Sequence, residues 1–365
     1  MDELRDAPLS PRQLGALLWA SGVSPMIRRA PEAVGPAGRA AWVSALLCLP
    51  AAWLLGLLLG RITADRRPGE GAGELLCRGM GALPGRVGCG LCGGWFVFYA
   101  GYVLRAGADR FVAAVYPESG EWVFMLVMGA LALMAGAGAV KTLGRFAQLA
   151  GPCLGGVFVF VFLFCLPNVD PLNLLPLPAG FGRAAGRGML PLAEALAVGA
   201  FPAFLAGRTE KGSLTRAFTG PLLALAVLGA ALCVTIPGTY GPELAEKMNH
   251  PFFVMIRSVK IFDLLERVEA LVAAQWVAAD FVLLGLLLHL AAGSLTTALR
   301  GPGAAPGRGI AALCFGGMML CAAGCASTAF RLRDLGEQVI GPGCALLSFG
   351  LLPGGWVLGK LRRKI

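Results

Sequence analysis

The feature that most constrains the fold is a series of long apolar segments that recurs along the whole chain of 365 residues. A helix needs about 20 apolar residues to cross the hydrocarbon core of a bilayer. Only helices and closed barrels satisfy their backbone hydrogen bonds there. Charged residues make up 14% of the chain, against about 25% in soluble domains. The sequence therefore predicts an all-α polytopic membrane protein.

Ten transmembrane helices are expected from the lengths of these segments. They lie near residues 11–34, 37–60, 86–114, 121–140, 146–167, 189–207, 216–237, 268–291, 309–327 and 339–359. Between the seventh and eighth, residues 238–267 have mixed character, which indicates a surface loop carrying one or two short helices.

A polar stretch, residues 170–187, divides the expected helices five and five. It contains asparagine, prolines and glycines, which are typical of a connector rather than a span. We therefore expect one transmembrane domain, 1–365, made of a first five-helix repeat at 9–168 and a second at 188–360.

Two of the expected helices carry helix-breaking residues at matching places. The first span is interrupted at Gly22–Pro25 and the sixth at Gly199–Pro202, about half the chain apart and each in the first span of its repeat. Discontinuous helices at corresponding positions mark the midplane binding site of secondary transporters. The pairing predicts a 5+5 inverted repeat with broken helices 1 and 6 and a small-molecule site between them.

Free backbone N–H groups at the start of a half-helix attract anionic groups such as a carboxylate. The candidate ligand-binding residues are those at the two breaks, aromatic residues of the third and eighth spans that could wall a pocket, and two acids inside spans. They are Ser21, Gly22, Val23, Ser24, Pro25, Tyr99, Glu194, Val198, Gly199, Ala200, Phe201, Pro202, Trp276 and Asp280.

The two acids have alternative interpretations. A charge inside a span is costly and is a functional candidate by default, so Glu194 or Asp280 could bind an amine, relay a proton or pair with a cation. Alternatively, each is a structural group that pairs with a neighbouring helix. The aromatic residues could equally be packing residues or interface anchors.

Several function classes are excluded by missing patterns. The sequence has no glycine-rich phosphate loop, no H-E-x-x-H and no G-x-S-x-G motif, which argues against an enzyme. The eleven cysteines lie mostly in apolar segments and the chain has two histidines. Buried cysteine acting as a small hydrophobic residue explains them better than a metal or redox site, so no cofactor is expected.

The net charge of +10 does not indicate nucleic-acid binding, because the basic residues are scattered between spans without interleaved aromatics. Topology signals and contacts with lipid headgroups account for them better. Lys and Arg are more numerous on the side that carries both termini, which predicts cytoplasmic termini. No small-residue cleavage site follows the first apolar run, so we expect that run to remain as a helix.

Short stretches in a fixed order resemble one family. Its motifs are similar to Leu9–Gln13 (S-P-x-Q), Ala41–Ser44 (A-W-(I/V)-S), Pro68-Gly69 with Glu74 and Gly81, Arg145, Leu172–Pro176 (N-L-L-P), and Leu265–Leu271 (L-E-R-x-(E/D)-A-L). The chain resembles the spore-germination endospore permease family, the B subunit of nutrient germinant receptors, within the amino acid–polyamine–organocation superfamily. It departs from that pattern at Arg28-Arg29, just beyond the first break, and after about residue 290 only the hydropathy agrees.

The resemblance implies a LeuT-type bundle in the inner membrane of a spore. Such a protein would bind a small nutrient, often an amino acid, and would act with an A subunit and a lipoprotein C subunit. The residues themselves leave two alternatives open. One is a cation- or proton-coupled amino acid transporter with Glu194 or Asp280 as coupling group, and the other is a scaffold without a ligand.

Overall fold

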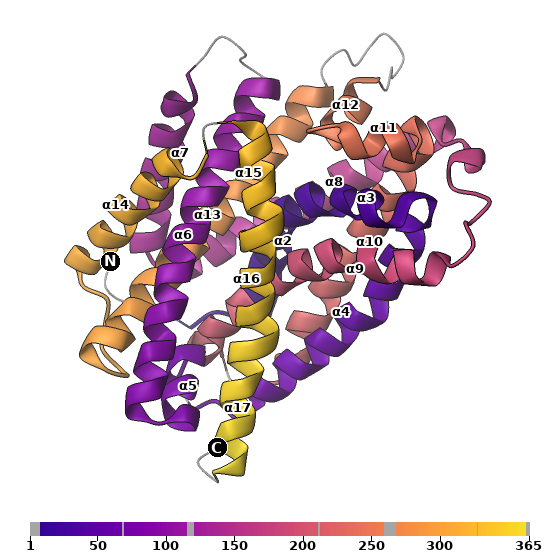
Figure 1. The fold of residues 1–365 in the computed structure, drawn as a ribbon. Helices are drawn as coiled ribbons and strands as arrows, with labels where there is room; N and C mark the ends of the chain where they lie inside the picture. Colours follow the sequence, from indigo (N-terminus) through magenta and orange to yellow (C-terminus); the bar gives the residue numbers. More distant parts are fainter. Residues whose placement is uncertain are drawn as a thin grey trace.

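The computed structural model describes residues 8–67, 69–114, 120–210, 212–258, 268–326 and 328–362, and the described chain is helical (Figure 1). Pro68 and residues 265–267, which belong to the family-like stretches, lie outside these ranges. The α-helices are α2 (Pro11–Arg29), α3 (Val34–Ala37), α4 (Ala41–Ala64), α5 (Ala72–Met80), α6 (Ala82–Ala114), α7 (Glu121–Ala137), α8 (Val140–Cys165), α9 (Phe181–Val198), α10 (Thr215–Tyr240), α11 (Pro242–Lys247), α12 (Pro251–Ser258), α13 (Val268–Arg300), α14 (Arg308–Gly324), α15 (Ala329–Leu335), α16 (Gly341–Ala345) and α17 (Leu352–Leu361).

Seven helical stretches in the described part of the chain are long and apolar enough to cross a bilayer. They are Pro11–Ala64, Ala82–Ala113, Val140–Asn168, Phe181–Arg208, Thr215–Tyr240, Ala270–Arg300 and Ala329–Leu361. The first holds both α2 and α4, between which the chain turns at Gly38, whose φ of 54° favours glycine. The apolar helices α7 and α14 are shorter. Every range expected from the sequence overlaps a helical segment, and the protein is a multi-pass membrane protein.

The long helices pack in two groups. In the α10 group, α10 packs against α2 and α4. Helix α9 also packs against α2 and α4. In the α13 group, α13 packs against α6 and α7, and α14 packs against α6. Helix α2 also contacts α8 and α13, so it lies between the groups near the centre of the bundle (Figure 1).

Small residues allow close approach within each group. A Cβ atom on Gly56 of α4 would lie 2.7 Å from the Cα of Thr219 on α10, and one on Gly93 of α6 would lie 2.6 Å from Leu295 of α13. Helix association in membranes depends on this kind of backbone approach, because lipid is as apolar as the side chains.

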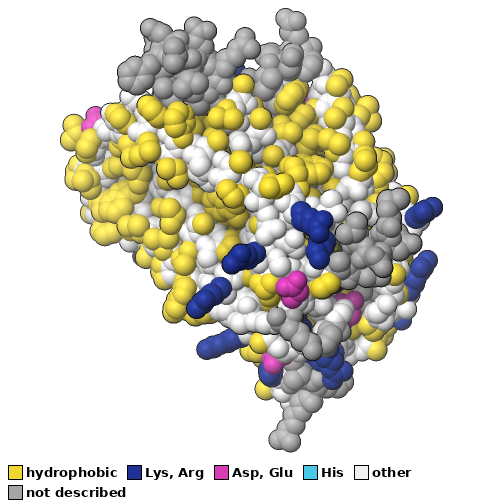
Figure 2. Space-filling model, turned by 180° about the vertical axis from the view of Figure 1, so that it is seen from behind, with side chains coloured by type: hydrophobic (Ala, Val, Ile, Leu, Met, Phe, Trp, Pro, Cys, Tyr) yellow, Lys and Arg dark blue, Asp and Glu magenta, His cyan; other side chains and the backbone are white. Residues whose placement is uncertain are grey.

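The surface is divided by side-chain type. Figure 2 shows apolar side chains over most of the visible face, whereas Lys and Arg gather towards its lower end. In Figure 1 the C-terminus lies at that same lower end. An apolar belt with a basic end is typical of a bundle that sits in a bilayer.

The interruption expected in the first span is absent from the structure. Helix α2 remains α-helical from Pro11 to Arg29, through Gly22 and Pro25. Proline at position 25 removes one backbone donor, and the rest of the hydrogen-bond ladder continues. The α-helix changes to a 3-10 helix, η1, only at Ala30–Ala33.

The sixth span changes its helix type where the sequence places its interruption. Helix α9 ends at Val198, Gly199 and Ala200 form a turn, and a 3-10 helix, η5 (Phe201–Arg208), follows. A Cβ atom on Gly199 would lie 2.6 Å from Leu222 of α10, so this turn is packed closely against the neighbouring helix.

The last span is irregular as well. Between α15, α16 and α17 the chain forms two π-helical segments, Gly336–Ile340 and Leu346–Leu351. Such segments are frequent at functional sites. Ser348, in the second segment, donates a hydrogen bond of 2.6 Å from its hydroxyl to the carbonyl of Ala197, beside the turn in the sixth span. The last span therefore contacts the sixth span at its irregular point.

Candidate ligand-binding site

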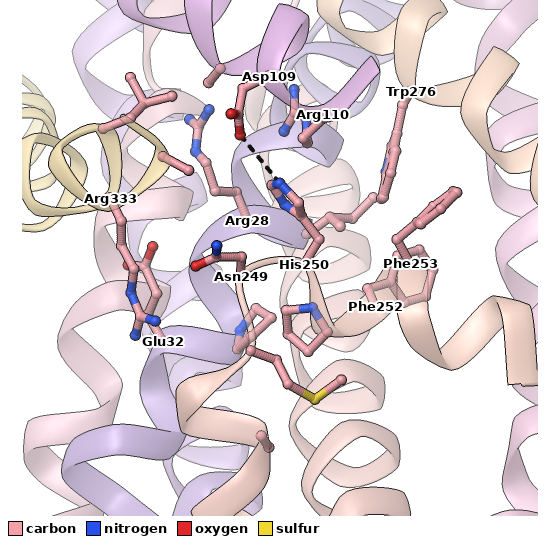
Figure 3. Close-up of a pocket in the computed structure, with 18 of the residues that line it drawn as sticks. Arg28, Glu32, Asp109, Arg110, Asn249, His250, Phe252, Phe253, Trp276 and Arg333 are labelled. Carbon is pink, nitrogen blue, oxygen red and sulfur yellow. Dashed lines mark hydrogen bonds and ion pairs between the residues drawn. The ribbon is translucent and has the colours of Figure 1, made fainter. Parts of the chain in front are cut away.

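A cavity of about 80 Å³, measured as space open to the centre of a water molecule, lies where the end of α2 meets α6, α12, α13 and α15 (Figure 3). We call it the main cavity. Its lining residues are Ile27, Arg28, Pro31, Glu32, Tyr102, Ala106, Asp109, Arg110, Ala245, Glu246, Met248, Asn249, His250, Pro251, Phe252, Phe253, Trp276, Ala329, Leu332 and Arg333. Because the cavity joins helices from both groups, its shape depends on how the two groups are arranged.

One wall of the main cavity is aromatic. The ring centroids of Phe252 and Phe253 on α12 lie 5.9 Å and 5.8 Å from that of Trp276 on α13. Figure 3 shows the three rings together on one side of the site. A concave site with an aromatic wall and a few polar groups is typical of small-molecule pockets.

Arg28 reaches the main cavity from the last turn of α2. Its guanidinium carbon lies 4.8 Å from the ring centroid of Tyr102 on α6, which is a cation–π contact. Its Nε and Nη1 atoms are buried and have no hydrogen-bond partner. Arg28 therefore lines the cavity and has two buried donors without a hydrogen-bond partner.

Arg110 and Asp280 form a buried ion pair between α6 and α13, with 2.6 Å between Nη2 and Oδ2. The exposed fractions of their side chains are 8% and 4%. The Arg110 guanidinium also lies 5.7 Å from the Trp276 ring centroid. A second cavity, of about 10 Å³, is lined by these three residues together with Gly107 and Phe124 among others. The volume is sufficient for about one water molecule.

Arg29 forms ion pairs with Glu32 of η1 and with Glu194 of α9. A Cβ atom on Gly341 of α16 would collide with Glu194 and would lie 2.7 Å from Nη2 of Arg29. The glycine thus leaves room for the ion pair. A third cavity, of about 10 Å³, lies beside it.

Polar contacts join the elements at the rim of the main cavity. His250 Nε2 lies 3.3 Å from Asp109 Oδ2, which joins the start of α12 to α6 (Figure 3). Arg333 of α15 donates to the carbonyl of Glu246 on α11 and forms an ion pair with Glu337. The rim therefore consists of side-chain contacts, which can rearrange without unfolding a helix.

The structure brings some of the expected site residues together. Pro25, Tyr99, Glu194 and Val198 line the third cavity, Trp276 lines the main and second cavities, and Asp280 lines the second. The other expected residues are buried but do not line these three cavities. They are Ser21, Gly22, Val23, Ser24, Gly199, Ala200, Phe201 and Pro202.

Several residues of the main cavity were not expected from the sequence. Arg28 was noticed only as a departure from the family pattern, although a charge at the end of an apolar span was a usable signal. Asn249 and His250 lie in the mixed stretch between two spans, which gave no periodicity by which to place them. Asp109 lies one turn beyond Arg105 and could have been found in the same way as Glu194.

The model of a family described as "Spore germination protein" (Spore_permease) matches residues 10–300. The chain belongs to the spore germination permease family. The family consists of permeases rather than enzymes, and the resemblance inferred from the short motifs is confirmed. A comparison with curated protein sequences finds no match.

Solved structures of transporters share the fold. MhsT in complex with L-phenylalanine is 15% identical, with a TM-score of 0.64, over 97% of this chain and 89% of that one. A Na⁺-coupled sialic acid symporter in a substrate-bound, outward-open state is 13% identical, with a TM-score of 0.59, over 96% and 78%. Mhp1, a nucleobase-cation-symport-1 family transporter in a closed conformation with bromovinylhydantoin bound, is 13% identical, with a TM-score of 0.57, over 96% and 79%. The permease family chain therefore has the LeuT-type fold.

Proposed function

We propose that this chain is the membrane subunit of a spore nutrient-germinant receptor. It binds a small nutrient such as an amino acid in the main cavity and triggers germination together with the A and C subunits. The observation that carries the proposal is the main cavity itself, which combines an aromatic wall with a guanidinium that has unused donors. Membership of the family supports the role in germination.

The proposed membrane arrangement is a ten-helix 5+5 inverted repeat. The first repeat, 9–168, contains α2, α4, α6, α7 and α8, and the second, 188–360, contains most of α9 with η5, then α10, α13, α14 and the stretch from α15 to α17. Fold similarity to transporters over nearly the whole chain supports this. We also place both termini in the cytoplasm, with the chain in the inner spore membrane. The basic end seen in Figure 2, which is the end of the C-terminus in Figure 1, supports this for the C-terminus. The main cavity, at the far end of α2 from Pro11, then faces outwards.

Ligand binding can act on the partners through the arrangement of the helices. A ligand that contacts one arrangement more strongly than another shifts the population towards it. The main cavity touches both helix groups, so an occupant contributes contacts that depend on their relative position. An A or C subunit bound to the bundle would then detect the shift.

An amino acid transporter driven by a cation or proton is the second candidate, and one observation favours it. A larger cavity, of about 460 Å³, lies at the other end of α2 and is lined by Pro8, Arg208, His289 and Arg308 among others. Alternating access needs a route from each side of the membrane to one site. The two cavities lie at opposite ends of the central helix, as such routes would.

A thermal-shift screen of the purified chain against the common amino acids tests nutrient binding. A ligand at 100 times its Kd stabilises the native state by about 2.7 kcal/mol. Ala106→Phe places a ring in the main cavity, whereas Ala113→Phe, on the exposed side of the same helix, is the matched control. We expect the shift to disappear only in the Ala106 variant, and spores carrying that variant to lose the germination response.

The results separate the candidate functions. Binding without accumulation in proteoliposomes supports the receptor, and ion-driven accumulation of the labelled amino acid supports the transporter. If no amino acid raises the melting temperature and spores with Ala106→Phe germinate normally, the chain acts as a scaffold and the proposed binding function is wrong.

A further inference from the structure

Arg28 differs from the other arginines inside the bundle. Arg29, Arg105 and Arg110 each form an ion pair with a carboxylate. Among the described residues no carboxylate lies within ion-pair distance of Arg28, and its Nε and Nη1 are buried without a partner. Its guanidinium carbon lies 4.8 Å from the ring centroid of Tyr102, and its side chain also interacts with Tyr99. Two of the three guanidinium nitrogens of Arg28, Nε and Nη1, therefore have no hydrogen-bond partner.

A buried cation without a neighbouring anion is unfavourable, because the free energy lost when the cation leaves water is not recovered in an ion pair. The same feature becomes favourable when a ligand supplies the anion. The planar guanidinium presents paired donors that match a carboxylate, and such charged hydrogen bonds are about twice as strong as neutral ones. Stacking on Tyr102 fixes the plane of the group before a ligand arrives, which lowers the entropic cost of binding.

The charges around the main cavity favour an anion at Arg28. Of the three acids that line it, Glu32 is already paired with Arg29, Asp109 contacts His250, and Glu246 of α11 is exposed. The aromatic wall around Trp276 favours an organic ligand over a small inorganic ion, because it offers apolar contact area.

We propose that Arg28 binds the carboxylate of the nutrient, so the main cavity accepts small carboxylic acids with an apolar or aromatic body and discriminates against their uncharged analogues. The proposal rests on the function proposed above and specifies its ligand class. Arg28 takes over the role that the sequence assigns to free N–H groups at a break in the first span, a break that α2 does not have.

Matched probe pairs test the proposal on the purified full chain. The pairs are benzoate with benzamide, L-phenylalanine with L-phenylalaninamide, and L-alanine with L-alaninamide. Each amide keeps the shape of its acid and lacks the negative charge. Affinities come from thermal-shift titrations at constant ionic strength, with chloride and inorganic phosphate as separate arms.

We expect the binding carboxylates to bind about 10- to 100-fold more tightly than their amides, since a hydrogen bond to a charged group is involved. Arg28→Gln abolishes this preference, Arg28→Lys keeps part of it, and Arg12→Gln, at an exposed site on the same helix, leaves it unchanged. Without ligand, Arg28→Gln melts at the same temperature as the wild type or higher, because the variant buries no unpaired charge.

Three results overturn the proposal: equal binding of acid and amide, a preference that survives in Arg28→Gln, or competition showing that chloride or phosphate is the tighter occupant. If amino acids and their amides bind equally well and the acids trigger germination, the proposed nutrient function is supported. The proposed role of Arg28 is then wrong. If benzoate binds more tightly than benzamide, this preference is lost in Arg28→Gln, and no amino acid triggers germination, the carboxylate site is supported. The proposed nutrient function is then wrong. If no probe binds, both fall.

Discussion

Replacing Asp280 with asparagine tests whether this acid is a structural partner or a coupling group. Asn keeps the volume and an acceptor for Arg110 but removes the charge. Both side chains are almost fully buried and lie 2.6 Å apart. Removing one partner of a buried ion pair costs about 3–5 kcal/mol, because an unpaired charge remains. The cation–π contact of Arg110 with Trp276 is present in both the wild type and the variant, so it does not change this cost, whereas the acceptor that Asn retains places the effect at the lower end of the range. We therefore expect Asp280→Asn to lower the free energy of unfolding by about 3 kcal/mol.

A double-mutant cycle measures this expectation. The free energy of unfolding is determined by denaturant titration of the purified chain in detergent for Asp280→Asn, Asp280→Leu, Arg110→Met and the double variant Arg110→Met/Asp280→Leu, and the last three form the cycle with the wild type. Each single variant leaves one unpaired charge, whereas the double variant leaves none. Replacing a whole buried pair by apolar residues is often neutral or stabilising. The double variant should therefore be more stable than either single variant.

The reasoning is refuted if Asp280→Asn unfolds at the same denaturant concentration as the wild type, or if the double variant loses the sum of the two single effects. Unchanged stability together with loss of ion-driven amino acid uptake would instead identify Asp280 as a coupling group. The cycle thus decides between the two interpretations that the sequence leaves open.

Three further predictions concern other contacts. Ser348→Ala removes the hydrogen bond to Ala197 and should lower the free energy of unfolding by about 1 kcal/mol, measured by the same titration with an exposed serine variant as control. Gly341→Ala forces a Cβ atom against Glu194 and should destabilise the chain by about 1–3 kcal/mol; a variant as stable as the wild type would contradict the packing described here. Burial would raise the pKa of Asp65, but hydrogen bonds from a lysine and a tryptophan of α17 outweigh it and hold that pKa below its ordinary value. The stabilisation is then present above a pH of about 4 and is lost as the pH falls through the folded-state pKa, so melting curves between about pH 3 and 6 should be flatter for Asp65→Asn than for the wild type.

The positions of the helices were predictable because apolar runs of membrane length have few alternative structures. The change of helix type after Val198 was predictable as well, since Gly199 and Pro202 lie within one turn of each other. The same reasoning was wrong for the first span. A single proline removes one donor, and packing of α2 against α8, α9, α10 and α13 holds the helix together across that position.

The candidate site was only partly predictable. Glu194 and Asp280 could be found because any charge inside an apolar run is conspicuous. Their partners, Arg29 and Arg110, could not be assigned, because they lie 165 and 170 residues away in the sequence. Which charge stays unpaired depends on these pairings, so the importance of Arg28 becomes visible only when the helices are assembled.

The pairings also suggest how a ligand could act on the bundle. Arg29 and Glu194 join two helices of the α10 group, and Arg110 and Asp280 join two helices of the α13 group. Each buried pair therefore joins helices within one group and not across the two groups. Arg28 belongs to the first group and stacks on Tyr102 of the second. A carboxylate bound there contacts the boundary between the two groups, where a small rearrangement can be passed to a partner subunit.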